Sequence, residues 1–162
     1  MLKFRKADSL DIALLRSLAR EIWVANYRLI LSPEQIEYML GLMYSAEVIG
    51  NELREGILWE VVEQNQSPIG FIAITFQNEK AKLNKLYLKS EVHGHGYGQI
   101  SLAHVMDVAR AQKADTLLLT VNKNNEKAVK AYEKAGFNRV DSKVFDIGNG
   151  YVMDDYIYSI SL

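Results

Sequence analysis

Three glycines alternate with other residues in the stretch "HGHGYG", where they occupy positions 94, 96 and 98. Glycine adopts positive φ and allows close approach, so the backbone N–H groups of such a loop can point together at an anion. The apolar residues that follow, from Ile100 to Ala109, have helical spacing, and a helix N-terminus behind the glycines adds a partial positive charge. The stretch predicts a pyrophosphate cradle, the alternative being a tight strand-to-helix connection without a ligand.

Two well-known phosphate-binding patterns do not fit this loop. The phosphate loop of nucleotide triphosphatases requires Lys-Ser or Lys-Thr after the glycines, whereas Gln99 and Ile100 follow here. A dinucleotide-binding fingerprint requires a further spaced glycine and an acidic residue at the end of the next strand. Asp115 instead precedes the next predicted strand, "TLLLTV". A dinucleotide-dependent oxidoreductase is therefore disfavoured, and nicotinamide binding would identify one.

A second group of residues with chemical potential lies in "NNEKAVKAYEKAGF", residues 124–137. Asn125 can cap a helix there, and Gly136 is placed to end it. Asn125, Ala128 and Tyr132 are spaced three and four residues apart, so they lie along one helix face. A small residue between an amide and a phenol predicts a shallow track that ends at a potential proton donor.

Together, the two motifs resemble those of the GNAT superfamily of acyl-CoA-dependent N-acetyltransferases, over residues 82–137. The loop pattern of that family is Gln or Arg, two residues, Gly, one residue, and Gly or Ala. The stretch from His93 to Gly98 matches both glycine positions, and His93 replaces the usual Gln or Arg, which leaves the backbone cradle unchanged. The family's later pattern is matched at Asn125, Ala128, Tyr132, Glu133, Lys134, Gly136 and Phe137.

This resemblance implies an α/β fold with a single mixed, mostly antiparallel central sheet of about seven strands flanked by helices. Residues 1–162 would form a single N-acetyltransferase domain that uses acetyl-CoA as co-substrate and no metal. Pantetheine would lie beside the strand before the loop like an added strand, bonded to its backbone near Leu86 and Leu88. The implied cofactor-binding residues are Leu86, Tyr87, Leu88, His93, Gly94, His95, Gly96, Tyr97, Gly98, Gln99, Asn122, Asn125 and Lys134.

Acetyl transfer from a thioester to an amine requires a base, hydrogen-bond donors for the developing oxyanion, and an acid near the sulfur. Tyr132 is the candidate acid, because a phenol with its reference pKa near ~10 is protonated at pH 7. His93 and His95 lie in the phosphate loop, so we expect them to contact the cofactor or to be exposed. We do not expect them to bind a metal, because no third ligand is nearby. We expect direct transfer in a ternary complex, without a covalent enzyme intermediate.

The base and the acceptor site are less constrained by the sequence. Adjacent Asp154 and Asp155 point to opposite faces of a strand, so at most one of them reaches a pocket, and a water chain could replace either. Trp23 and Tyr27 near the end of the first helix are either core residues or walls of the acceptor pocket. The candidate bases are Glu21, Glu60, Asp154 and Asp155.

A looser resemblance concerns the acceptor. The stretches "SPEQIEYML" and "VMDDYIYS" are similar to the bacterial polyamine (spermidine/spermine) acetyltransferase branch. Glu21, Asp154 and Asp155 could hold a polycation, or they are ordinary surface acids. We therefore predict a small-molecule primary amine such as a polyamine as acceptor. The alternatives are a protein or peptide N-acetyltransferase and a non-catalytic acyl-CoA-binding module.

The composition restricts the class of protein. The chain has 162 residues, 49% of them apolar, and a net charge of −1, which predicts a single soluble domain without the basic field of a nucleic-acid binder. It contains no cysteine, which excludes disulfides, thiolate metal sites and an acyl-cysteine intermediate. A leader sequence and a run of ~18 apolar residues are absent, so we expect a cytoplasmic protein without a membrane partner.

Periodicity outlines the elements that would position these residues. A strand at 2–5 precedes a helix capped by Asp8 or Ser9, and Ser32, Pro33 and Gln35 begin a second helix in capping-box order. A short helix near 45–56 is followed by strands at 57–64, 69–77 and 82–89 with a turn at "NQSP", a helix at 97–112 and a strand in "ADTLLLTVN", residues 114–122. The chain ends in a hairpin with a turn at residues 148–150, which is either core or the edge of a homodimer.

Overall fold

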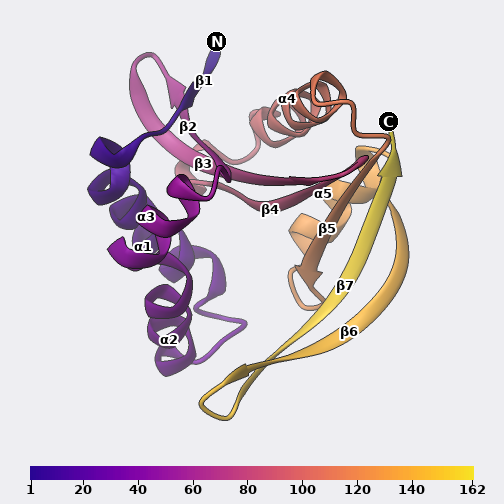
Figure 1. Ribbon diagram of the computed structural model, residues 1–162. Coiled ribbons are helices and arrows are strands. Elements are labelled where there is room, and N and C mark those ends of the chain that lie inside the picture. Colours follow the sequence, from indigo (N-terminus) through magenta and orange to yellow (C-terminus); the bar gives the residue numbers. More distant parts are fainter. The chain divides into compact units, whose positions relative to one another are not determined.

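Seven strands, in the order β1-β2-β3-β4-β5-β7-β6, form the sheet of the computed structural model, which describes all residues, 1–162. The predicted α/β class with about seven strands is confirmed. Internal contacts divide the chain into two compact units: unit 1 comprises Met1–Ile74 and Lys85–Tyr97, and unit 2 comprises Thr75–Asn84 and Gly98–Leu162. The elements, labelled in Figure 1, are β1 (Leu2–Lys6), α1 (Ile12–Tyr27), α2 (Pro33–Tyr44), α3 (Ala46–Arg54), β2 (Leu58–Gln64), β3 (Ser67–Gln77), β4 (Lys80–Leu88), α4 (Tyr97–Ala111), β5 (Thr116–Asn122), α5 (Glu126–Lys134), β6 (Asn138–Gly148) and β7 (Tyr151–Ser161), with short 3-10 helices η1 (Ser9–Asp11) and η2 (Ser90–Val92).

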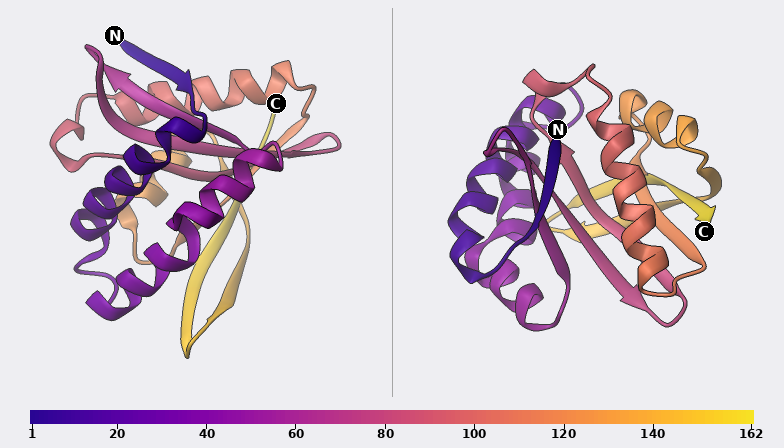
Figure 2. Two further views of the ribbon diagram at one scale, coloured as in Figure 1. Left: turned by 60° about the vertical axis from the view of Figure 1, so that its left-hand side comes forward. Right: turned by 90° about the horizontal axis from the view of Figure 1, so that it is seen from above.

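In unit 1, β1, β2 and the first part of β3 pair antiparallel, and α1, α2 and α3 lie together beside them (Figure 2). Helix α1 buries Leu15, Leu18 and Ile22, which recur at helical spacing. Helix α2 begins as its sequence predicts, because Ser32 accepts a hydrogen bond from the Gln35 backbone N–H behind a proline at the first helical position.

The turn between β2 and β3 is shorter than the sequence indicates. Asn65 and Gln66 both have positive φ, 50° and 66°, as a two-residue hairpin turn requires. Ser67 and Pro68, predicted to belong to the turn, are the first residues of β3, and a register shift after Val62 accommodates the proline opposite Glu63. The hairpin therefore extends two residues further than the composition of "NQSP" implies.

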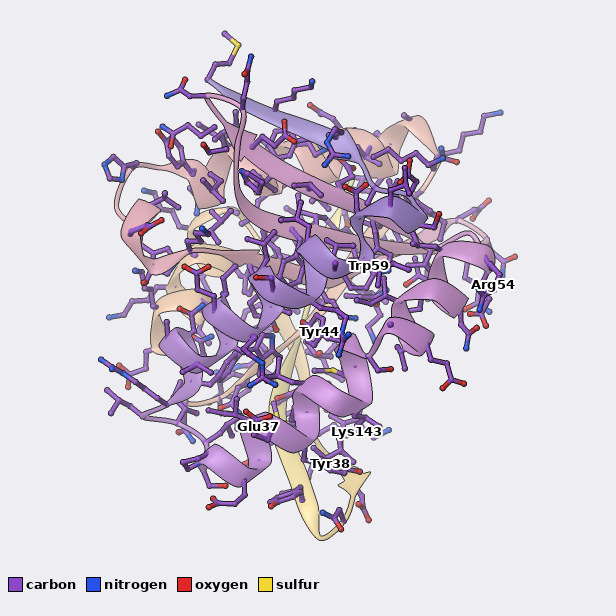
Figure 3. The ribbon with its side chains drawn as sticks, turned by 90° about the vertical axis from the view of Figure 1, so that its left-hand side faces the viewer. Glu37, Tyr38, Tyr44, Arg54, Trp59 and Lys143 are labelled. Carbon is purple, nitrogen blue, oxygen red and sulfur yellow. The ribbon has the colours of Figure 1, made fainter.

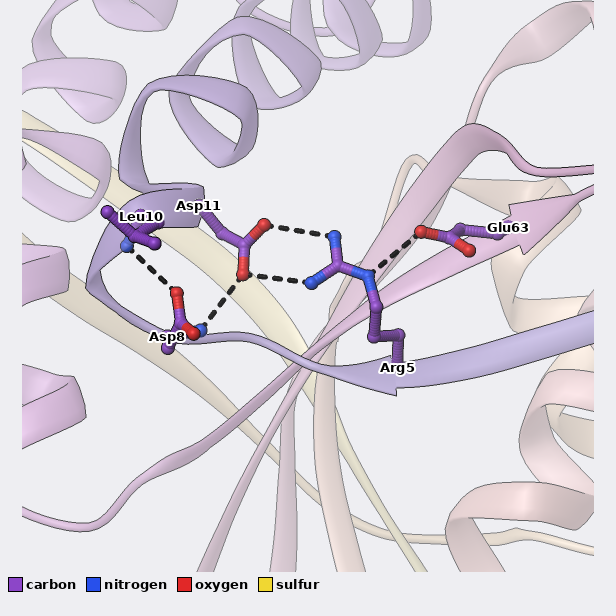
Figure 4. Close-up of polar contacts among 5 residues, drawn as sticks. All are labelled: Arg5, Asp8, Leu10, Asp11 and Glu63. Carbon is purple, nitrogen blue, oxygen red and sulfur yellow. Dashed lines mark hydrogen bonds and ion pairs between the residues drawn. The ribbon is translucent and has the colours of Figure 1, made fainter.

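An ion-pair network connects β1, η1 and β2 at the start of unit 1 (Figure 4). Asp8 caps η1 by accepting from the Leu10 N–H, and Asp11 accepts from the Asp8 N–H at 3.0 Å, so the two form a capping box. The Arg5 guanidinium donates to both oxygens of Asp11 at 2.9 and 3.0 Å and to Glu63 at 2.9 Å. These hydrogen bonds hold the pKa of Asp11 below its usual value although burial opposes them. The network ties β1 to β2 and to the beginning of α1.

In unit 2, β4 pairs parallel to β5, from Lys80–Leu83 to Thr116–Leu119, and β5 pairs antiparallel to β7. Strand β7 forms a long hairpin with β6, which is the last strand of the sheet (Figure 1). Its turn at Asn149 and Gly150 has φ of 54° and 79°, which these residue types tolerate. The mixed, mostly antiparallel pairing agrees with prediction. No helix of the protein has the length and apolar character needed to cross a membrane.

Candidate active site

The glycine loop of unit 1 follows β4 and η2 and leads into α4. Gly94 and Gly96 have φ of +83° and +79°, a conformation that favours glycine. A Cβ added at either residue would meet no atom within 4 Å, and the same holds for Gly98 where the chain passes into unit 2. The loop therefore has open space at the positions that a cradle needs, which fits a pyrophosphate group.

Two histidines hold this loop in shape. The His93 Nε2 lies 3.0 Å from the Leu88 carbonyl oxygen, and the His95 Nδ1 lies 3.1 Å from that of Val92 and 3.2 Å from that of His93. Because a carbonyl only accepts, each of these ring nitrogens must donate. The His95 ring also stacks on Tyr97, with centroids 5.6 Å apart, and the Tyr97 hydroxyl accepts from the Gln64 side chain. The hydrogen bond to the Leu88 carbonyl therefore gives His93 a positioning role at the place where the family pattern has Gln or Arg.

An aromatic cluster buries the predicted acceptor-site residues of α1. Trp23 is 2% exposed, donates from Nε1 to the Tyr44 hydroxyl at 3.0 Å and stacks on Tyr27 at 4.5 Å. Tyr87 of β4 lies 5.7 Å from the Trp23 ring, and its hydroxyl is 3.5 Å from that of Tyr27. Burial raises the pKa of Tyr44 well above its usual value. Trp23 and Tyr27 thus belong to the core of unit 1, and their role toward an acceptor stays a prediction.

Lys85 is a largely shielded charge that the sequence did not single out. Its side chain is 10% exposed, and its Nζ lies 5.4 Å from the ring centroid of Tyr44 and 5.0 Å from that of Trp59. Figure 3 labels these two aromatic residues, which come from α2 and β2. Glu52 of α3 lies 3.9 Å from the Lys85 Nζ, and its pKa is raised because burial outweighs the attraction of the lysine. The sequence carries no signal for it, because the same strand also contains Lys80 and Lys82.

Of the acidic residues in unit 1 that could act as base, Glu21 is exposed and Glu60 is buried. Glu21 on α1 lies 3.5 Å from the Lys89 Nζ. Glu60 on β2 is 5% exposed. The carboxylate of Glu21 therefore faces solvent beside a lysine.

The helix that carries Tyr132 in unit 2 has the predicted ends. Asn125 accepts from the Ala128 N–H at 3.3 Å, and Gly136 follows the helix with φ of +101°. The Tyr132 carbonyl accepts from the Phe137 N–H at 3.1 Å, and the two rings meet edge to face at 5.9 Å. The Tyr132 side chain is half-buried.

Three other predicted cofactor-binding residues of unit 2 contact α5 or the residues that begin it, and a fourth is exposed at its end. Gln99 of α4 donates to the Ala131 carbonyl of α5 at 2.9 Å. Asn122, 7% exposed at the end of β5, accepts from the Asn124 N–H on its side chain and from the Asn125 N–H on its carbonyl. These contacts bring Gln99, Asn122 and Asn125 to α5, whereas Lys134 is exposed in its last turn.

Asp154 and Asp155 of β7 have opposite surroundings, as the strand period predicts. Asp154 is exposed and forms an ion pair of 2.8 Å with Lys123. Asp155 is 7% exposed, and its Oδ1 has no hydrogen-bond partner. Burial and, to a smaller extent, repulsion from Asp154 raise the pKa of Asp155 to about 6, although the attraction of Lys82 and Lys123 opposes the change.

The face of β7 opposite Asp155 is charged and aromatic. The Arg139 guanidinium lies 4.3 Å from the Tyr156 ring centroid, and both residues line a cavity of about 310 Å³ together with Lys123 and residues of α5. Asp154 lies on this same face of β7, exposed and paired with Lys123. Neither unit contains a group of three or more His, Cys, Asp or Glu residues that could hold a metal ion.

The sequence profile of the Acetyltransferase (GNAT) family matches residues 15–137, which is most of the chain. The chain belongs to the GNAT acetyltransferase family. As a GNAT enzyme, it is an acetyl-CoA-dependent N-acetyltransferase, and the resemblance seen in the sequence is confirmed.

Three similar proteins illustrate the range of this GNAT chain's relatives. Peptidyl-lysine N-acetyltransferase YjaB of Salmonella typhimurium is 30% identical over 113 residues, covering 69% of this chain and 72% of that protein. Spermidine N(1)-acetyltransferase of Thermoplasma acidophilum is 28% identical over 158 residues, covering 94% and 96%. The crystal structure of PaiA N-acetyltransferase from Thermoplasma acidophilum in complex with coenzyme A superposes with a TM-score of 0.87 at 28% identity, covering 100% and 99%.

Proposed function

We propose that this enzyme moves the acetyl group of acetyl-CoA directly to a primary amine of a small molecule, with a polyamine as the favoured acceptor. The observation that carries the proposal is the glycine loop, since Gly94 and Gly96 adopt positive φ and face open space. Their N–H groups, with those at the beginning of α4, would hold the pyrophosphate of the substrate. Strand β4 near Leu86 would pair with pantetheine.

Tyr132 is the acid in this proposal. The neutral amine attacks the thioester carbonyl, the N–C bond forms and the C–S bond breaks. The nitrogen gives up one proton to a base or to water, and Tyr132 gives its hydroxyl proton to the thiolate of coenzyme A and regains one from solvent. The helix caps at Asn125 and Gly136 fix the backbone that carries the phenol. The ring contact with Phe137 restricts the phenol's orientation, which supports a role that depends on position.

The similarity to spermidine N(1)-acetyltransferase over 94% of the chain supports a polyamine as acceptor. A second acceptor class, the side-chain amine of a protein lysine, is supported by the 30% identity to peptidyl-lysine N-acetyltransferase YjaB. Both classes present a primary amine to the same chemistry. A non-catalytic acyl-CoA-binding module differs from both, because it would not need the Tyr132 hydroxyl.

Thiol release from acetyl-CoA tests the proposal, measured with spermidine, spermine, aminoglycosides, free amino acids and lysine-containing peptides. We expect turnover with one amine class, and Tyr132→Phe should lower kcat by a factor of about 10²–10⁴, the usual contribution of a positioned acid. The dissociation constant for acetyl-CoA should stay within a factor of two or so of that of the wild type, because the hydroxyl acts on the leaving sulfur.

Tyr151→Phe, which removes a phenol at the β6–β7 turn of the same unit, is the matched control and should keep the wild-type rate. Turnover by Tyr132→Phe at the wild-type rate would remove Tyr132 from the mechanism. Absence of acetyl-CoA binding to the wild-type protein would overturn the proposed function itself.

A further inference from the structure

Four carboxylates could act as the base, and the structure distinguishes among them. Glu21 and Asp154 are exposed and paired with Lys89 and Lys123. Glu60 is buried and takes part in another interaction. Asp155 combines 7% exposure with an Oδ1 that has no donor. A buried acceptor without a donor costs free energy, and in native proteins such groups commonly mark a functional site.

The position of Asp155 connects it to the helix of the proposed acid. In the antiparallel pairing of β5 with β7, Asp155 lies opposite Asn122, the last residue of β5. The Asn122 carbonyl accepts from the N–H of Asn125, the residue that caps α5. Asp155 is therefore adjacent to the segment that begins the Tyr132 helix.

The charges around Asp155 leave its Oδ1 available to a cation. Lys82 of β4 and Lys123 after β5 attract the carboxylate, Lys143 of β6 lies opposite it in register, and Asp154 repels it. Lys123 is held 2.8 Å from Asp154 on the other face of β7. No hydrogen bond from these lysines reaches the Oδ1. An ammonium or amine group from a ligand would supply the missing donor.

We propose that Asp155 binds the nitrogen of the acceptor amine and takes its proton during acetyl transfer. This inference rests on the proposed function. As the N–C bond forms, the attacking nitrogen releases one proton to the Asp155 carboxylate, and as the C–S bond breaks, the sulfur receives one proton from Tyr132. Solvent then removes the proton from Asp155 and restores the one on Tyr132, so the protons balance over a turnover. The carboxylate would also favour cationic acceptors over neutral ones.

The test uses the full-length enzyme, acetyl-CoA and spermidine, or the amine that turns over best. For Asp155→Asn we expect kcat/KM to fall by a factor of about 10² or more, as for loss of a general base, with unchanged affinity for acetyl-CoA. Asp155 must be ionised to accept a proton, and its pKa is about 6. The wild-type rate should therefore fall as the pH drops through about 6, and Asp155→Asn should lack this acidic limb. Asp155→Glu should recover part of the rate.

Two further aspartates of the β6–β7 hairpin provide comparisons. Asp141→Asn removes an exposed carboxylate of β6 that bonds the adjacent Ser142 N–H, and it should leave the rate unchanged. Asp154→Asn tests the neighbour, because a large loss there with a wild-type rate in Asp155→Asn would overturn the proposal. If Asp155→Asn does not fold, the wild-type pH profile decides, since a profile without the acidic limb also overturns it. If Asp155→Asn turns over at the wild-type rate, the role of Asp155 is overturned but the proposed function stands. If the wild type turns over no amine at all, the proposed function itself is contradicted.

Discussion

Asp11 and Asp155 are aspartates of nearly equal exposure, 8% and 7%, yet their surroundings differ in every other respect. Asp11 receives two hydrogen bonds from Arg5 and one from the Asp8 N–H (Figure 4), and its pKa is lowered. Asp155 has an oxygen without a donor, and its pKa is raised to about 6. Burial alone therefore does not decide whether a carboxylate stabilises the protein. The number of donors that reach it does.

The largest effect on stability is expected at Asp11. Asp11→Asn removes the charge that Arg5 and the capping box both use, and we expect a loss of about 2–3 kcal/mol in the free energy of unfolding. Urea unfolding at pH 7 measures it. The matched control is Asp107→Asn on α4, whose exposed pair with Arg110 should contribute less than about 0.5 kcal/mol. Equal losses for the two variants would contradict the comparison.

The contribution of the Asp11 carboxylate should also depend on pH. Its folded-state pKa is lowered, so the stabilisation is complete above the unfolded-state pKa and is lost as the pH falls through the lower folded-state pKa. The difference between the wild type and Asp11→Asn should therefore persist at pH 5 and shrink only in strong acid.

At Asp155 the sign should be reversed. Its folded-state pKa is raised from 3.8 to about 6, so ionisation destabilises the fold progressively as the pH rises through this window, and the penalty is complete above it. At pH 8, Asp155→Asn should therefore unfold at a higher urea concentration than the wild type, with a free energy of unfolding larger by at most about 3 kcal/mol. Near pH 4 the two proteins should be equally stable. A loss of stability at pH 8 would indicate a structural role. Lower activity together with higher stability would be the signature of a functional carboxylate.

The smallest effect is expected at Arg5. Arg5→Lys keeps the positive charge but loses the planar fork that donates to Asp11 and Glu63 at the same time, so we expect a loss of about 1 kcal/mol. The double variant Arg5→Lys/Asp11→Asn should lose less stability than the sum of the two single losses, because both substitutions break the same network. Additive losses, measured by the same urea titrations, would mean that Arg5 acts mainly through Glu63.

Local features of this fold were predictable from the sequence because short-range contacts decide them. Ser32 and Asn125 cap their helices as predicted, and the mixed sheet follows from alternating apolar runs and a helical crossover. At the first long helix the prediction of Asp8 or Ser9 as cap was wrong, because Asp8 caps the 3-10 turn η1 and the N-cap of α1 itself is Asp11, which makes no side-chain cap bond. The role of the terminal hairpin as a dimer edge stays a prediction.

Features that depend on contacts between distant strands were not predictable. The sequence places Asp154 and Asp155 on opposite faces, but which of them is buried depends on the register of β7 against β5, and a slip of one residue would exchange them. Lys85 acquires its shielded position from Tyr44, Trp59 and Glu52, which come from three other elements. The roles of the predicted cofactor-binding residues and of Tyr132 stay predictions that the proposed kinetics would test.

Gly70 and Gly98 differ in whether a side chain added there would disturb the fold. A Cβ at Gly70 of β3 would lie 2.2 Å from the Tyr87 backbone oxygen, so every other amino acid there forces two strands apart. At Gly98 an added Cβ meets no atom within 4 Å, so the fold should tolerate it. Substitutions at Gly70 should therefore reduce the amount of folded protein, whereas those at Gly98 should not, and inactive but abundant Gly98→Ala would support the predicted role of Gly98 in cofactor binding.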